Sequence, residues 1–209
     1  FCDAVIRDDT GTITRVNVSG FNANSEKISG IDYELAYATD LGTLPGRLTL
    51  RVLASNTLKR SITAMGGTTN LLGMIAAGHS PKWRWYNSLT YDSDAIRTQL
   101  SMRRIGAGVL DNRNIECTTG CPAATPANPT IDNNRIKGAT YFDLSQTFKV
   151  KLGERDAQFY GIVENLFDKD PPVAAISSFL FPGATANFHD TVGRRFRIGV
   201  VQPDRAADG

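Results

Sequence analysis

Apolar and polar residues alternate along seven segments of this 209-residue chain. In the first segment, Ile31 and Tyr33 fall on one face of an extended chain, while Asp32 and Glu34 fall on the other. Such period-two alternation is typical of a β-strand with one apolar and one polar face, so it predicts an all-β fold. The alternating segments are residues 28–39, 47–58, 82–91, 95–105, 138–150, 157–166 and 192–201.

These segments have the length of strands that cross a lipid bilayer. A tilted membrane strand needs about 9–11 residues, and it presents apolar side chains to lipid only at every second position. Windows with apolar residues three and four positions apart are scarce, and no apolar stretch is long enough for a membrane helix. The sequence therefore predicts an antiparallel meander of about seven strands that forms part of a transmembrane β-barrel.

Three short polar connections alternate with three long ones. In an outer-membrane barrel, short turns face the periplasm and long loops face the outside of the cell. We therefore expect the long connections to lie together at one edge of the sheet. The short connections are residues 40–46, 92–94 and 151–156, and the long ones are residues 60–81, 106–137 and 167–191.

Residues 1–27 are predicted to be an extracellular loop hairpin. Its turn lies at residues 8–11, where the composition Asp-Asp-Thr-Gly favours positive φ at Gly11. A closed single-chain barrel has an even number of strands, whereas seven alternating segments are counted here. Because the count is odd and the chain begins at Phe1 without an export signal, we expect the last part of a longer barrel.

Two motifs near the end of the chain resemble the TonB-dependent outer-membrane receptors. Residues 159–172 read FYGIVENLFDKDPP and residues 193–200 read GRRFRIGV, which is similar to the last two strands of that family. Residues 30–38, 82–91 and 141–145 resemble earlier strands in the same order. The motif positions are Asn165, Leu166, Phe167, Asp168, Pro171, Gly193, Arg194 and Phe196.

The resemblance implies a barrel of about 22 strands around an N-terminal plug, with residues 28–201 as about its last seven strands and their loops. Residues 202–209 form an atypical tail, because family members usually end on an aromatic residue and Pro203 interrupts a strand here. The implied function is active uptake of a scarce solute, such as a siderophore, metal chelate, vitamin or saccharide, across the bacterial outer membrane. The solute itself is not identified.

The resemblance also implies the partners. They are outer-membrane lipid, the small-molecule solute, the plug and the remaining barrel strands. The energy-coupling protein TonB would act only through the part that is missing here. The family is one of receptors and not of enzymes, and it implies no cofactor.

Basic side chains on the polar faces of the predicted strands are candidates for contact with the solute. Arginines that line a lumen attract an anionic solute, such as a metal chelate or an acidic saccharide. The alternative is that these arginines pair with carboxylates of the plug. The candidate lumen residues are Arg51, Arg84, Tyr86, Arg97, Arg103, Arg195 and Arg197.

Aromatic residues are dense in residues 82–91. Trp83, Trp85 and Tyr91 share the apolar face, which favours an interfacial girdle at head-group depth over a carbohydrate-stacking platform. Tyr86 falls on the opposite face, and it is therefore grouped with the lumen candidates.

Cys117 and Cys121 lie close together in a long connection. Outside the cytoplasm such a pair favours a disulfide over a zinc site, for which only His79 and His189 offer further histidine ligands. Cys2 is then left without a partner.

Other chemistry finds little support. Asn165, Asp168 and Asp170 favour a turn in which Asx side chains bond the local backbone over a metal site. The chain has no G-x-S-x-G elbow, and residues 106–108 lack the third glycine and the helix of a dinucleotide loop. A net charge of +2 with scattered basic residues argues against a nucleic-acid surface.

Two alternative folds remain at this stage. A soluble β-sandwich binding module would bury apolar residues such as Ile31, Leu35, Leu48, Leu50 and Val52 between two sheets. A small stand-alone outer-membrane barrel would need about eight strands.

Overall fold

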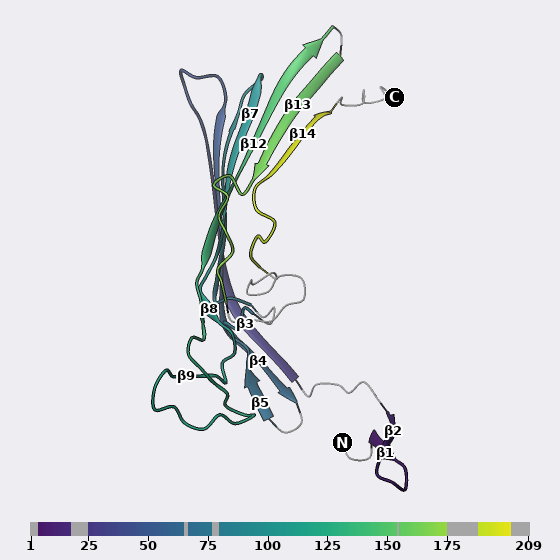
Figure 1. Ribbon diagram of the computed structural model, residues 1–209. Helices are drawn as coiled ribbons and strands as arrows, with labels where there is room; N and C mark the ends of the chain where they lie inside the picture. The colour runs from purple at the N-terminus through teal and green to yellow at the C-terminus, as the bar shows by residue number, and fades with distance from the viewer. Residues whose placement is uncertain are drawn as a thin grey trace.

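Seven long strands of the computed structural model form one antiparallel meander (Figure 1). The structure describes residues 4–17, 25–64, 67–76, 80–153, 155–174 and 188–201. The long strands are β3 (Ser25–Asp40), β4 (Arg47–Ala64), β6 (Trp83–Asp92), β7 (Ile96–Ile105), β12 (Ala139–Leu152), β13 (Arg155–Glu164) and β14 (Arg195–Val201). Long strands that follow one another in the chain pair with each other, so β3 and β14 form the two edges of the sheet. β5 (Gly67–Asn70) extends the sheet beside the end of β4.

This arrangement confirms the predicted all-β class and antiparallel meander. The strands form where apolar and polar residues alternate, because each extended chain then presents two uniform faces to its surroundings. No helix in the described ranges is long and apolar enough to cross a membrane. Closure of the sheet into a barrel and its embedding in lipid stay predictions.

Several strand boundaries differ from those predicted from the sequence. β3 begins at Ser25, so the predicted N-terminal loop is shorter than residues 1–27. β4 continues to Ala64, beyond the predicted end at Leu58, and this extension pairs with the start of β3 and with β5. The register shifts opposite Ser29 and Gly30. Such a bulge adds one residue to one strand, and it thereby inverts the alternation on which the prediction relied.

The short and long connections lie at opposite ends of the sheet. In Figure 1 the turns after β3, β6 and β12 lie at the upper end, and the connections after β4, β7 and β13 extend from the lower ends of their strands. Within the connection between β7 and β12, β8 (Gly108–Val109) pairs antiparallel with β11 (Arg135–Ile136), and β9 (Ile115–Glu116) pairs parallel with β10 (Thr130–Ile131). The long loops therefore share one edge, as expected.

The predicted N-terminal hairpin is also present. β1 (Val5–Arg7) pairs antiparallel with β2 (Ile13–Val16), and Gly11 has a φ of 85° in the turn. The Asp8 carboxylate accepts hydrogen bonds from the side chain of Thr10 and the backbone of Thr12, and these bonds hold the pKa of Asp8 below its usual value.

The buried hydrophobic clusters lie at the loop end of the molecule, among the long connections and the adjoining ends of β7 and β12. Ile75, Leu110, Ile136 and Ala174 form one buried cluster, although they come from three different connections. Phe188 packs against this cluster and against a second one formed by Ile105, Ala139 and Tyr141. The connections thus form a packed cap at the loop end, while most of the sheet is a single layer.

Candidate functional site: the two faces of the sheet

One face of the sheet carries a continuous apolar row. Strand register places one residue from each long strand side by side, with neighbouring Cβ atoms about 5 Å apart. This apolar row consists of Tyr37, Leu50, Leu89, Leu100, Leu144, Val163 and Phe196.

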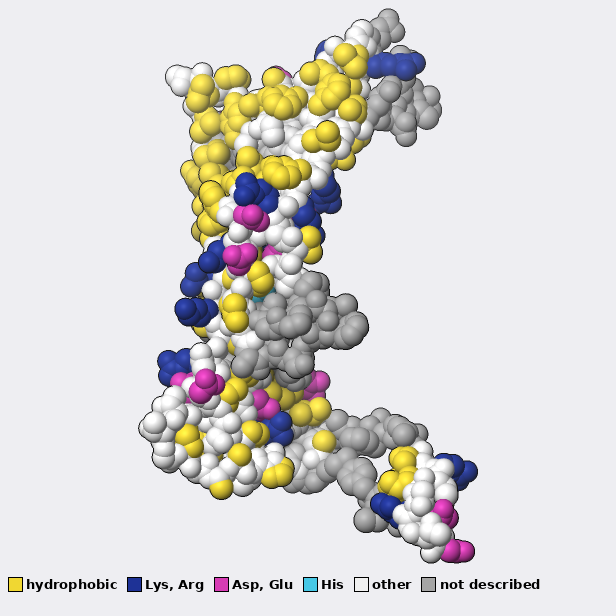
Figure 2. Space-filling view, viewed as in Figure 1, with side chains coloured by type: hydrophobic (Ala, Val, Ile, Leu, Met, Phe, Trp, Pro, Cys, Tyr) yellow, Lys and Arg dark blue, Asp and Glu magenta, His cyan; other side chains and the backbone are white. Residues whose placement is uncertain are grey.

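Four members of the apolar row are exposed, and the other three, Leu50, Leu144 and Val163, are half-buried. The exposed fraction is 60% for Tyr37, 69% for Phe196 and 88% for Ile198. In Figure 2 hydrophobic side chains gather near the turn end, and charged side chains lie below them. Soluble monomers seldom leave such a contiguous apolar surface open, so this face requires an apolar covering.

Aromatic side chains border the apolar face. Trp83 stacks on Tyr33 and on Trp85, with ring centroids 6.1 and 5.3 Å apart. At the turn end of the same strand, the Tyr91 hydroxyl donates to the Pro45 carbonyl oxygen at 2.7 Å. At about 3.3 Å per residue, the distance along β6 from Trp83 to Tyr91 is about 26 Å, which is a height of about 20 Å for a strand tilted by about 40°.

Polar residues on the apolar face bond to one another. The Thr98 hydroxyl donates to Gln146 Oε1 at 2.6 Å, and Arg104 donates to the Thr140 hydroxyl at 3.0 Å. Each pair joins β7 to β12, so each of these groups has one hydrogen bond within the sheet. The cost of exposing them to an apolar surrounding is thereby reduced.

All seven candidate lumen residues lie on the opposite, polar face, as strand register shows. The structure gives five of the six arginines carboxylate partners within the same chain. Arg51 contacts Glu34 at 2.8 Å, Arg97 contacts Asp92 at 3.9 Å, and Arg195 and Arg197 both pair with Glu164. Arg103 forms two hydrogen bonds with Asp143, at 2.9 and 3.2 Å.

These ion pairs are a third arrangement beside the two considered from sequence. The arginines were expected to face either a solute or plug carboxylates, whereas the sheet supplies the carboxylates itself. Glu34, Glu164 and Asp143 were not singled out from sequence. Opposite charges on adjacent strands are the signal, and it becomes readable only once the register is known.

The Asp143 carboxylate on the polar face accepts three hydrogen bonds. Besides accepting both bonds from Arg103, it accepts the backbone N–H of Asn165 at 2.9 Å. Arg103 also lies 5.5 Å from the centre of the Tyr141 ring. The hydroxyl groups of Tyr86 and Ser101 share a hydrogen bond of 3.3 Å. The bonds of Asp143 link β7, β12 and the residue after β13, and the separate bond between Tyr86 and Ser101 links β6 to β7.

The two family-like motifs meet in one turn. Asn165 is fully buried with a φ of 52°, and its side chain bonds the backbone N–H and carbonyl of Lys169. Asp168, also at a φ of 52°, accepts the Arg194 N–H at 2.9 Å and pairs with its guanidinium at 3.5 Å. The Phe167 ring meets Phe142 edge-on, with centroids 5.4 Å apart.

The contacts of this motif turn are structural. Asn and Asp tolerate the left-handed conformation because their short side chains bond the local backbone. Leu166 donates its N–H to the Phe142 carbonyl oxygen at 2.7 Å, and Gly193 has a φ of 84°. Pro171 follows the turn, and Phe196 lies on the apolar row. The predicted Asx turn is therefore present.

Asn165→Ala should destabilise the motif turn by about 2 kcal/mol, because alanine strains the left-handed backbone and removes buried hydrogen bonds. The measurement is the urea midpoint of the chain folded in detergent, followed by circular dichroism. Asp170→Ala is the matched control, since Asp170 is an exposed residue of the same motif. Equal midpoints for the two variants would contradict the structural role of Asn165.

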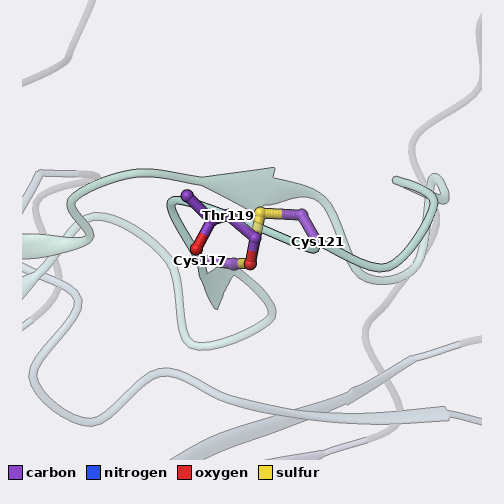
Figure 3. Close-up of a disulfide and its surroundings, with 3 residues drawn as sticks. All are labelled: Cys117, Thr119 and Cys121. Carbon is purple, nitrogen blue, oxygen red and sulfur yellow. A yellow bond between two sulfur atoms is a disulfide. The ribbon is translucent and has the colours of Figure 1, made fainter.

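Cys117 and Cys121 form a disulfide in the long connection between β7 and β12 (Figure 3). Their Cα atoms are 5.6 Å apart, which is an ordinary separation for a disulfide. Cys2, His79 and residues 202–209 lie outside the described residues. Within the described ranges, no group of three His, Cys, Asp or Glu side chains is placed to hold a metal ion.

Asn134 organises the same connection. It is buried, and its side chain bonds the backbone N–H and carbonyl of Asp111. The Asp111 carboxylate accepts hydrogen bonds from the Arg113 side chain, the main reason why the pKa of Asp111 lies below its usual value. This carboxylate stabilises the folded loop above its unfolded-state pKa, and that stabilisation is lost as the pH falls through its folded-state pKa.

Comparison with known proteins adds no assignment. No protein-family model matches the chain, and no curated protein or solved structure matches it. Its function is therefore inferred from the two faces of the sheet and from the motif turn.

Proposed function

We propose that this chain is the C-terminal barrel segment of a TonB-dependent receptor in the bacterial outer membrane. Its apolar face contacts lipid, its polar face lines the lumen, and its long connections face the outside of the cell. The main supporting observation is the exposed apolar row that crosses all seven long strands. A lipid bilayer would cover such a face.

The other elements of the sheet fit this role. Both edges, β3 and β14, are without a further strand partner among the described residues. In a membrane every exposed backbone group needs a hydrogen-bond partner, so further strands of the receptor would complete the barrel. The plug would occupy the lumen, and TonB would act through the plug during uptake of the solute.

The two alternative folds receive less support. Ile31, Leu35, Leu48, Leu50 and Val52 lie on a single sheet, and the described residues include no second large sheet that packs against them. A stand-alone barrel would require β3 and β14 to pair, and the described residues show no such pairing.

The two tryptophans provide a direct test of the proposal. Trp83 and Trp85 are the only tryptophans in the chain, and register places both on the apolar face. After reconstitution into phospholipid vesicles, their fluorescence should be quenched by brominated acyl chains and protected from aqueous acrylamide. Lipid quenching is expected because the rings lie at the border of the apolar band.

The matched control moves one tryptophan to the polar face. In the variant W83F/W85F/Y86W, the indole should lose quenching by brominated lipid and become accessible to acrylamide. Tyr86 and Trp85 are adjacent in β6 and differ only in the face that they occupy. Acrylamide quenching of the unmodified protein, without quenching by brominated lipid, would reject the lipid-facing assignment.

A further inference from the structure

Arg84 differs from the other arginines among the lumen candidates. Those five pair with carboxylates of the same chain, whereas Arg84 has no carboxylate partner among the described residues. Its register neighbours are Ser55 on β4 and Ile105 on β7, and neither of them is charged. Asp32 lies one strand beyond Ser55 in the same row, and it forms no ion pair with Arg84. Within the described part of the polar face, the Arg84 guanidinium is thus without a carboxylate partner.

Arg84 lines an open cavity of about 430 Å³. β4, β6 and β7 provide its floor, and Phe188 reaches it from the connection between β13 and β14. Arg103 and Arg104 also border the cavity, but the Arg103 guanidinium is held by Asp143, and Arg104 belongs to the apolar face, where it donates to Thr140. The lining residues that bear on the chemistry of a ligand are Leu53, Ser55, Arg84, Tyr86, Ile105 and Phe188.

The lining defines the chemistry of a ligand. A guanidinium presents parallel N–H donors that match the two oxygens of a carboxylate. Leu53, Ile105 and Phe188 offer apolar surface beside it, and the ring of Tyr86 offers an aromatic edge or face. A small, fully hydrated anion would leave this apolar surface uncovered, whereas an aromatic ring that carries a carboxylate satisfies both parts of the cavity.

We propose that this cavity binds an aromatic carboxylate, with Arg84 as the residue that holds its anionic group. As a statement about the transported solute, this rests on the proposed function, because the polar face must then line the lumen. As a statement about binding, it concerns only the cavity and is testable on the isolated chain.

The first experiment needs no variant. The full 209-residue chain, folded in a non-ionic detergent, is titrated with benzoate, benzamide and inorganic phosphate by isothermal calorimetry. Benzoate should bind with a Kd of about 1 mM, and benzamide should bind about tenfold more weakly. Absence of benzoate binding, equal binding of benzamide, or phosphate binding as tight as that of benzoate would overturn the proposal.

A pair of variants then locates the site. Arg84→Gln should weaken benzoate binding about tenfold, the effect expected for the loss of a charge-assisted hydrogen bond. Arg51→Gln removes the same charge from the same face outside the cavity, so it should leave the Kd of benzoate within about twofold of the unmodified value. Equal weakening in both variants would show a general charge effect and reject the site.

Failure of this proposal is distinguishable from failure of the proposed function. Lipid quenching of Trp83 and Trp85 tests membrane embedding and does not involve Arg84. Quenching without benzoate binding would reject the aromatic-carboxylate site alone. Benzoate binding without quenching would retain the site and reject its role in a membrane lumen.

Discussion

Leu89→Arg is expected to weaken insertion of the sheet into phospholipid vesicles by about 2 kcal/mol, because Leu89 lies between the middle of the apolar band and its Tyr91 border, and the cost of an arginine falls toward the border. Leu89 is the β6 member of the apolar row, where it lies between Leu50 and Leu100. The measurement is the urea dependence of folding in vesicles, monitored by tryptophan fluorescence.

Thr90→Arg is the control for this prediction. Thr90 neighbours Leu89 in the chain but lies on the polar face, beside a wide cavity at the turn end. The added charge would then face the lumen, and the free energy of insertion should change by less than about 1 kcal/mol. If both variants lose the same stability, the two faces do not differ in their surroundings.

Arg103→Gln is expected to cost about 3 kcal/mol, because Asp143 then keeps its charge in a half-buried position without its main partner. Asp143→Asn should cost less, since the amide oxygen can still accept the Asn165 N–H. The measurement is urea unfolding of the chain in detergent.

The double variant separates the pair from its surroundings. When both charges are removed together, the loss should be smaller than the sum of the two single losses, because neither charge is left unpaired. Additive losses would show that Arg103 and Asp143 stabilise the sheet independently. The exposed pair of Arg51 and Glu34 serves as reference, with an expected coupling of about 0–1 kcal/mol.

The strands were predictable because their signal is local. Leu48, Leu50 and Val52 alternate with polar residues, and a two-residue period needs no knowledge of neighbouring strands. The same test failed past Leu58, because the bulge opposite Gly30 breaks the period and is itself set by pairing. Seven strands and their order could thus be predicted, whereas the true length of β4 could not.

The polar face was predictable only as a list of residues. Alternation placed Arg103 on that face, but its bond to Asp143 joins positions 40 residues apart in the chain. The cluster of Ile75, Leu110 and Ile136 was hidden for a similar reason, because loop residues pack without any period. Contacts that depend on register or on loop packing carry no short-range pattern.

The residues of the motif turn determine which proteins a sequence search with this motif would find. Asn165, Asp168 and Arg194 bond to the turn, to each other and to β12, and none of them lines the cavity around Arg84. A search keyed to this turn would group proteins by how their last strands are joined, regardless of cargo. Proteins with identical turns can therefore bind different solutes, and under the proposed function the residues that select the solute would lie in the cavity wall.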